Sequence, residues 1–153
     1  MEERYRKALS LAAAMLGRRS LSESQLRQKL LDKQVEEDAA DWAVERMQEY
    51  GFVDDAAYAA MKAQALADRG YGLRRIVQEL RRRGIDRDLA EQAGADVQRE
   101  DGQLLQFFTR RFAGARPDGA ERQKAWAALY RRGFGTAEID AAWRQYVETL
   151  EEE

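Results

Sequence analysis

The chain has 153 residues, a formal net charge of -2, 35% charged residues and 44% hydrophobic residues. These values are typical of a folded protein with a highly charged surface and argue against intrinsic disorder. Cysteine and histidine are both absent, which excludes disulfides, thiolate metal sites, nearly all zinc sites and histidine-based catalytic triads.

The N-terminal part shows neither an export signal nor a membrane span. The start, Met1 to Arg4, is charged, and the apolar run from Ala8 to Leu16 is followed by arginines rather than by a small-residue cleavage site. No stretch approaches the roughly 20 apolar residues that cross a bilayer. We therefore expect a cytoplasmic protein that makes no membrane contact.

Helix is predicted nearly throughout the chain. One proline, Pro117, and an abundance of Ala, Leu, Arg, Glu and Gln favour helix, and no sustained alternation of β-branched residues indicates a strand. The candidate helix caps are Ser20 or Ser22, Asp54, Asp86 and Thr136, and the candidate C-terminal stops are Gly17, Gly51, Gly84 and Gly133. These residues predict helices over 3–16, 22–33, 36–50, 54–68, 72–83, 86–98, 100–113, 119–132 and 136–150.

One pattern occurs three times, at intervals of 49 or 50 residues. It consists of an apolar residue, a second one four positions later, a turn residue after another four, and then an apolar residue. This pattern predicts a buried helix face, a left-handed stop that favours glycine, and a following helix anchored by its first apolar side chain. The three copies are Leu26, Leu30, Gln34 and Val35; Ile76, Leu80, Gly84 and Ile85; and Ala125, Leu129, Gly133 and Phe134.

The repeats predict an all-α fold of three tandem three-helix units, over residues 1–53, 54–99 and 100–153, the last with an acidic tail. Because only neighbouring repeats touch in such proteins, we expect an elongated, curved array. The most loop-like stretch, residues 113–119, is predicted to let the last repeat pivot against the first two.

Positive charge is concentrated in one segment. Residues 69–83 contain six arginines and one acid, Glu79, and on the helix predicted there Leu73, Ile76, Val77 and Leu80 form the buried stripe. Exposed arginines also serve solubility alone, but so many like charges repel one another unless an anion lies nearby. We call Arg69, Arg74, Arg75, Arg81, Arg82 and Arg83 the arginine cluster.

Equivalent helices carry Arg27 and Lys29 in the first repeat and Arg131 and Arg132 in the third. Stacked repeats would align these groups with the arginine cluster along one groove, which suits a long anionic partner. Tyr71 beside the cluster is a candidate for stacking on a base, or alternatively packs on a neighbouring repeat. The tryptophans are expected in the core; they are Trp42, Trp126 and Trp143.

No active site is predicted, so we do not expect an enzyme. The best carboxylate pair, Asp54 and Asp55, precedes a helix and is explained as a cap. Gly70-Tyr71-Gly72 lacks the later glycine and lysine of a phosphate-binding loop. We expect neither a metal nor another cofactor.

Several short segments in a fixed order resemble the RecX family, from about Leu9 to Tyr146. The RGYG segment at residues 69–72, followed by Ile76, Glu79-Leu80 and Gly84-Ile85, is the most specific of them. The others are Arg19-Ser20 with Ser22-Glu23-Ser24-Gln25-Leu26 and Lys29-Leu30, Tyr50-Gly51-Phe52-Val53-Asp54-Asp55 with Tyr58, and Leu129-Tyr130-Arg131-Arg132-Gly133-Phe134 with Ile139 and Trp143.

The resemblance implies three three-helix units and a regulator without catalysis or cofactor. Members of the family bind RecA filaments on DNA, limit their extension or promote their loss, and lower strand exchange and RecA-dependent ATP hydrolysis during DNA repair, recombination and the SOS response. The partners expected from it are the RecA filament and single-stranded DNA without sequence preference, bound by a monomer. Two alternatives stay open: a helix-turn-helix transcriptional regulator, and a helical scaffold that binds only proteins.

Overall fold

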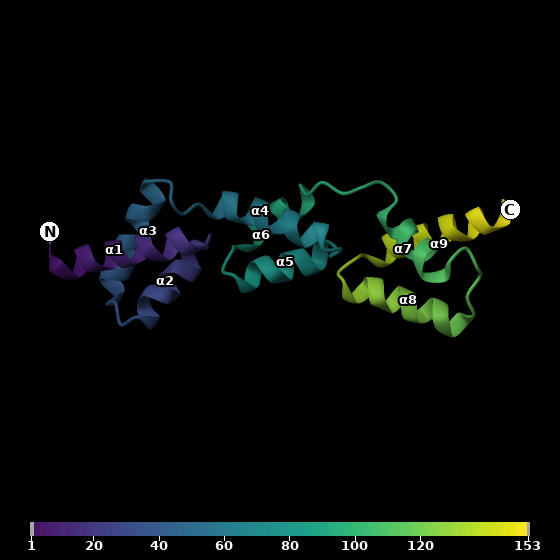
Figure 1. The fold of residues 1–153 in the computed structure, drawn as a ribbon, viewed down its shortest axis with the longest axis horizontal. Helices are drawn as coiled ribbons and strands as arrows, with labels where there is room; N and C mark the ends of the chain where they lie inside the picture. The colour runs from purple at the N-terminus through teal and green to yellow at the C-terminus, as the bar shows by residue number, and fades with distance from the viewer. Residues whose placement is uncertain (1, 153) are drawn as a thin grey trace.

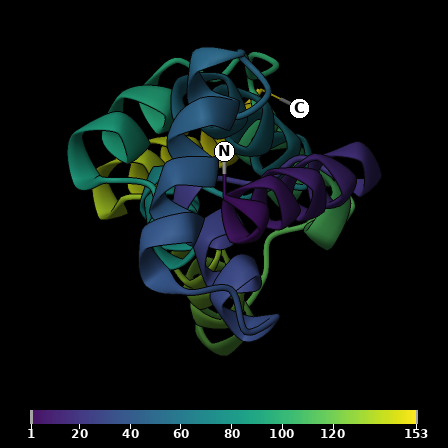
Figure 2. The ribbon, with the colours of Figure 1, turned by 90° about the vertical axis from the view of Figure 1, so that its left-hand side faces the viewer.

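The computed structural model describes residues 2–152, and the regular structure in this range is entirely α-helical. The helices lie in three groups along one axis, with the two chain ends at opposite ends of the molecule (Figure 1). Figure 2 looks along that axis and shows the first group in front of the others. The helices are α1 (Glu3–Arg18), α2 (Glu23–Asp32), α3 (Glu37–Glu49), α4 (Asp55–Asp68), α5 (Leu73–Arg82), α6 (Arg87–Ala95), α7 (Gln103–Phe112), α8 (Gly119–Arg131) and α9 (Thr136–Glu151).

Three of the predicted caps are confirmed. The Ser22 hydroxyl accepts from the backbone N–H of Gln25, and the carboxylates of Asp54 and Asp86 accept from N–H groups three residues on. The prediction for Thr136 was wrong: Gly135 precedes α9, and Thr136 is already its first helical residue.

The helix ends follow the predicted glycines with one exception. Gly51, Gly84 and Gly133 have φ values of 79°, 86° and 103°, in the left-handed region that an L side chain disfavours. In the first repeat Gln34 adopts the same conformation at φ 69°. Gly17 was wrongly predicted as a stop, because α1 continues through it to Arg18.

The connection between α6 and α7 is longer than predicted. Helix α6 ends at Ala95 rather than near residue 98, and α7 begins at Gln103 rather than near residue 100. Gly102, with φ 73°, lies immediately before α7, and this left-handed conformation cannot be part of an α-helix. Residues 96–102 therefore join the second group of helices to the third.

Each group of helices has its own hydrophobic core, so we call the groups the first, second and third units. In the first unit α3 packs against α1 and α2; in the second, α4, α5 and α6 pack on one another; in the third, α9 packs against α7 and α8. Val53 belongs to the first core and Tyr58 to the second. We propose unit boundaries after residues 53 and 99. The repeat positions buried in these cores are Leu26 and Leu30, Ile76, Leu80 and Ile85, and Ala125, Leu129 and Phe134.

The two junctions between units are built in the same way. The start of the second helix of one unit meets the left-handed turn that ends the second helix of the next. At the first junction the Ser22 hydroxyl donates to the Arg83 carbonyl at 2.5 Å. At the second, the Gly72 N–H donates to the Arg132 carbonyl at 2.7 Å. A Cβ added at Gly72 would lie only 2.5 Å from the backbone carbon of Gly133, so this approach requires glycine.

The proposed pivot at residues 113–119 was wrong. This segment connects α7 to α8, which both belong to the third unit, so it does not separate units. The hydroxyl of Tyr146, on α9, donates to the Ala115 carbonyl at 2.5 Å and fixes the segment to its own unit.

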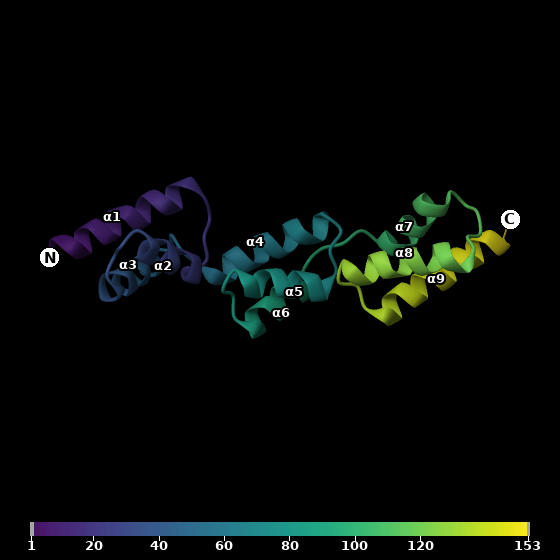
Figure 3. The ribbon, with the colours of Figure 1, turned by 90° about the horizontal axis from the view of Figure 1, so that it is seen from below.

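The second helices of the three units, α2, α5 and α8, follow one another along the lower side of the molecule in Figure 1, and Figure 3 shows the same succession from below. This row contains most of the basic residues singled out in the sequence. Among residues 2–152, no helix has both the length and the apolar character needed to cross a membrane.

Candidate nucleic-acid interface

Helix α5 and its C-cap, Arg83, carry the arginine cluster except for Arg69, which is the C-cap of α4. Ile76 and Leu80 are fully buried, which orients the helix so that Arg81 and Arg82 are exposed to solvent. The predicted buried stripe was wrong at Leu73, which is 45% exposed. Leu73 is the first residue of α5 and its side chain lies beside Gly94 at the edge of the core rather than within it.

Glu79 forms hydrogen bonds with several members of the arginine cluster. Its side chain is buried and accepts hydrogen bonds from Arg75 and Arg82 at 3.3 Å and from Arg83 at 3.0 Å. The hydrogen bond from Arg83, with further help from Arg75 and Arg82, lowers the pKa of Glu79 below its ordinary value despite burial. One carboxylate therefore holds three guanidinium groups, and the cluster is less free than its sequence indicates.

Arg74 contacts residues of the third unit at the second junction. Its guanidinium lies 4.1 Å from the centroid of the Tyr130 ring and donates to the Tyr130 carbonyl, while its backbone N–H donates to the Gly133 carbonyl at 3.2 Å. These contacts tie the second unit to the third. Arg74 is therefore a junction residue as well as part of a charged surface.

Tyr71 is half-buried and packs against the second core. The guanidinium groups of Arg69 and Arg75 lie 5.8 and 4.8 Å from its ring centroid. The ring is thus in contact with two cations and with the core of its own unit.

The basic residues of the first and third units differ in their contacts with other side chains. Arg27 forms an ion pair with Asp41 at 2.6 Å, whereas Lys29 is exposed on the same helix. Arg131 and Arg132 are exposed at the end of α8, and the Arg132 guanidinium lies 5.3 Å from the Phe107 ring centroid.

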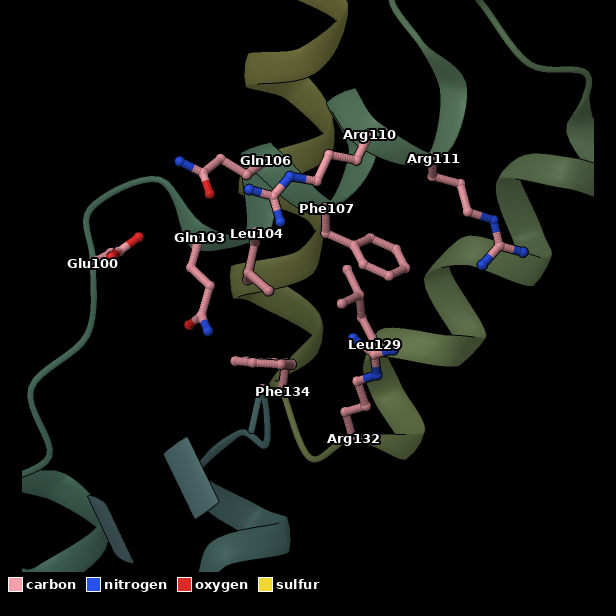
Figure 4. Close-up of a pocket in the computed structure, with 11 residues that line it drawn as sticks. Glu100, Gln103, Leu104, Gln106, Phe107, Arg110, Arg111, Leu129, Arg132 and Phe134 are labelled. Atoms are coloured by element: carbon pink, nitrogen blue, oxygen red, sulfur yellow. The ribbon is translucent and has the colours of Figure 1, made fainter. Parts of the chain in front are cut away.

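An open cleft of about 460 Å³ lies between α7 and the end of α8, next to the turn at Gly70 (Figure 4). Arg110 and Arg111, which the sequence analysis missed, stand on its rim with Arg132, and Leu104 and Phe107 contribute apolar surface. The basic pair Arg110-Arg111, following two phenylalanines, was the available sequence signal. We call this feature the α7–α8 cleft.

Asp54 and Asp55 both have structural partners. Asp54 caps α4 by accepting from the Ala57 N–H at 3.1 Å, and Asp55 accepts from the Glu23 N–H at 2.8 Å across the first junction. Within residues 2–152, no three acidic side chains gather in a way that could hold a metal ion.

The three tryptophans are half-buried against the unit cores, and so less buried than expected. Trp126 illustrates the reason: its ring stacks on Tyr130 with centroids 5.4 Å apart, while its indole N–H donates to the Asp140 carboxylate at 2.9 Å at the surface. An indole keeps its polar edge near a partner, which places the ring at a core boundary.

Fold and surface together define a helical-repeat protein with a row of basic second helices. Family models described as RecX, first three-helix domain, and RecX, second three-helix domain, match residues 8–47 and 54–93. The regulatory protein RecX of Deinococcus radiodurans is 34% identical over 149 residues, covering 96% of this chain and 72% of the relative. That of Xanthomonas campestris pv. campestris, strain B100, is 37% identical over 135 residues, covering 87% and 83%. The chain belongs to the RecX family of regulatory proteins.

Solved structures show the same fold. A crystal structure of RecX from Lactobacillus salivarius superposes with a TM-score of 0.78 at 17% identity and covers 95% of this chain and 98% of that one. A crystal structure of a regulatory protein RecX gives a TM-score of 0.71 at 22% identity, covering 99% and 73%. The all-α repeat architecture predicted from the sequence is confirmed by these likenesses.

Proposed function

We propose that this chain is a non-catalytic cytoplasmic regulator that binds the RecA filament on single-stranded DNA and inhibits its extension and its ATP hydrolysis. Its membership of the RecX family, over nearly the whole chain, carries the proposal. The elongated shape and the row formed by α2, α5 and α8 support it, because a long partner with regularly spaced charges suits such a surface (Figure 3).

The binding surface that we propose consists of the exposed basic side chains of the second helices, with the arginine cluster at its centre. Arg81 and Arg82 are exposed, and Arg82 remains 74% exposed although it contacts Glu79, whereas Arg74 belongs to the second junction and Arg83 is 24% exposed beside Glu79. The proposed contact residues are Arg69, Arg74, Arg75, Arg81, Arg82 and Arg83, with Arg27 and Lys29 in the first unit, Arg131 and Arg132 in the third, and Tyr71.

The test is the single-strand-dependent ATPase of RecA with this protein added. We compare the parent with Arg81→Gln/Arg82→Gln, which leaves both junctions intact, and with Arg87→Gln/Arg144→Gln, which removes the same charge from exposed positions on α6 and α9. The parent and the second variant are expected to inhibit equally, and the first variant to inhibit less. If the parent leaves hydrolysis unchanged at several-fold excess, the proposed function is wrong.

DNA binding distinguishes the alternatives. A transcriptional regulator protects a discrete operator in footprinting, whereas our proposal expects no sequence preference. A scaffold that binds only proteins has no affinity for DNA, whereas contact with about four phosphates of a single strand gives a log–log salt slope near -3.

A further inference from the structure

We propose that the α7–α8 cleft binds one nucleotide of a single strand, with its phosphate on the guanidinium groups at the rim and its base on the apolar floor. This inference rests on the nucleic-acid part of the proposed function. It adds a third-unit site that lies outside the arginine cluster and includes Arg110, Arg111 and Phe107.

The rim of the cleft has an excess of positive charge. Arg110, Arg111 and Arg132 line it, against one acid, Glu100. Within the described residues none of these three arginines forms an ion pair, in contrast to Arg75, Arg82 and Arg83 around Glu79. Their guanidinium groups are therefore available for a phosphate, which they bind through paired N–H donors.

The floor suits a nucleobase. Phe107 points into the cleft in Figure 4, and the guanidinium groups of Arg132 and Arg111 lie 5.3 and 6.0 Å from its ring centroid. Leu104, which is half-buried, extends the apolar surface, with the buried Leu129 and Phe134 behind it. Bases of single strands stack on aromatic rings and on guanidinium planes, and the in-plane N–H groups of a stacked guanidinium still face outward.

The size and the surroundings favour a single strand. The cleft of about 460 Å³ is open to solvent and can admit one unstacked nucleotide, whereas paired bases inside a duplex cannot reach its floor. Gly70 also lines the cleft, close to the Arg132 guanidinium, and directly follows Arg69 of the arginine cluster. A strand seated in the cleft can thus continue onto that cluster, and this favours a polyanion over an isolated acidic peptide side chain.

The phosphate part of the proposal is tested by binding of a fluorescent oligothymidylate in the absence of RecA. Arg110→Gln/Arg111→Gln is compared with Lys124→Gln/Arg144→Gln, which removes two exposed charges from the same unit outside the cleft. The first variant should bind at least about tenfold more weakly, with a log–log salt slope shallower by about 1.4. The second should bind like the parent; equal binding by all three proteins overturns the proposal.

The base part is tested by comparing oligothymidylate with an abasic strand of the same length. The parent should prefer the strand with bases by about tenfold, and Phe107→Leu, which keeps an apolar side chain, should lose that preference while binding the abasic strand unchanged. Photocrosslinking of a 5-iodouracil strand should mark residues 103–111. A parent without base preference, displaced equally well by polyglutamate, would show a site for acidic peptides and overturn the proposal.

Failure of the cleft and failure of the proposed function are distinguishable, because the cleft is assayed without RecA. If the parent inhibits the RecA ATPase but the cleft variants bind DNA normally, the cleft proposal is wrong and the function stands. If DNA binding depends on the cleft but RecA is unaffected, the cleft stands and the function is wrong.

Discussion

At the scale of single residues, Glu79 determines how the arginine cluster is arranged. It is 9% exposed and contacts three guanidinium groups, so its charge is compensated where a buried carboxylate alone would be costly. Arg75 and Arg83 are thereby fixed close to α5, while Arg82 stays 74% exposed despite its contact with Glu79, and Arg81 is exposed as well. Glu79, the one acid in the arginine-rich segment, is thus the residue that determines how the neighbouring arginine side chains are arranged.

Glu79 should make stability depend on pH. Because the folded-state pKa is below the ordinary value of 4.5, its contribution is present at neutral pH and is lost as pH falls through the folded-state value. Thermal unfolding from pH 7 to pH 3 should therefore show Glu79→Gln less stable than the parent at pH 7, by a margin that narrows toward the acid end. Glu91→Gln, exposed on α6, is the control and should follow the parent throughout.

The sequence predicts the charge of these side chains better than their roles. Six arginines in one segment are visible by inspection, but Arg74 reaches Tyr130 only after two units are joined, 56 positions apart. Arg110 and Arg111 line one cleft with Arg132 only in the folded third unit, because α7 and the end of α8 both contribute to that cleft. Leu73 fits the apolar period, yet the helix begins there and the core does not reach it.

At the scale of elements, Ser22 contributes both to a helix and to a junction. It accepts from the Gln25 N–H while the Gln25 side chain accepts from the Ser22 N–H, and its hydroxyl also donates to Arg83 of the next unit. The Ser22 side chain, which makes both the cap and the junction contact, is fully buried, and this is unusual for a helix cap.

Ser22→Ala should therefore cost more than the loss of an ordinary cap. We expect a decrease of about 2 kcal/mol in the free energy of unfolding, against about 1 kcal/mol for Asp86→Ala, which removes an exposed cap from α6. Urea denaturation of the two variants measures the difference. Equal losses would mean that the bond to Arg83 contributes nothing to stability.

Gly133 should be the least replaceable glycine of the second junction. Its φ is 103°, and an added Cβ would lie 2.6 Å from the Cβ of Arg75 and close to the Arg75 backbone. Gly133→Ala should lower the free energy of unfolding by about 2 to 4 kcal/mol. Gly51→Ala, with a similar φ of 79° but open space around it, should lose only about 1 kcal/mol, and thermal unfolding compares the two.

Helices are predictable here because their signals are local. Ser22, Asp54 and Asp86 cap the helices that their positions indicate, and the apolar repeat positions Leu26, Ile76 and Ala125 are all fully buried. The junctions are not predictable in this way, because residues about 60 positions apart make them, through backbone atoms at the second junction and through the Ser22 hydroxyl and the Arg83 carbonyl at the first. Of the features of these junctions, only the glycine positions could be recognised in the sequence.

At the scale of the whole molecule, three small cores replace a single large one. A compact domain of this length has a radius of gyration of about 15 Å. The extended row in Figure 1 should give a clearly larger value by small-angle X-ray scattering, unchanged over a concentration series if the protein is a monomer. A value near that of a compact domain would contradict the arrangement of the units.

The first unit carries a left-handed turn at the end of its second helix, as the other two units do. At the corresponding turns a preceding unit docks against Gly84 and Gly133, where a side chain would overlap with it: a Cβ at Gly84 would lie 2.6 Å from the Ser24 hydroxyl oxygen. The first unit has Gln34 there instead. Because Gln34 carries a Cβ where the other two units have glycine, the existing contact repeated at this turn would meet the same overlap. A protein that we propose to act along a polymer thus lacks, at one residue, the glycine through which its own units join one another.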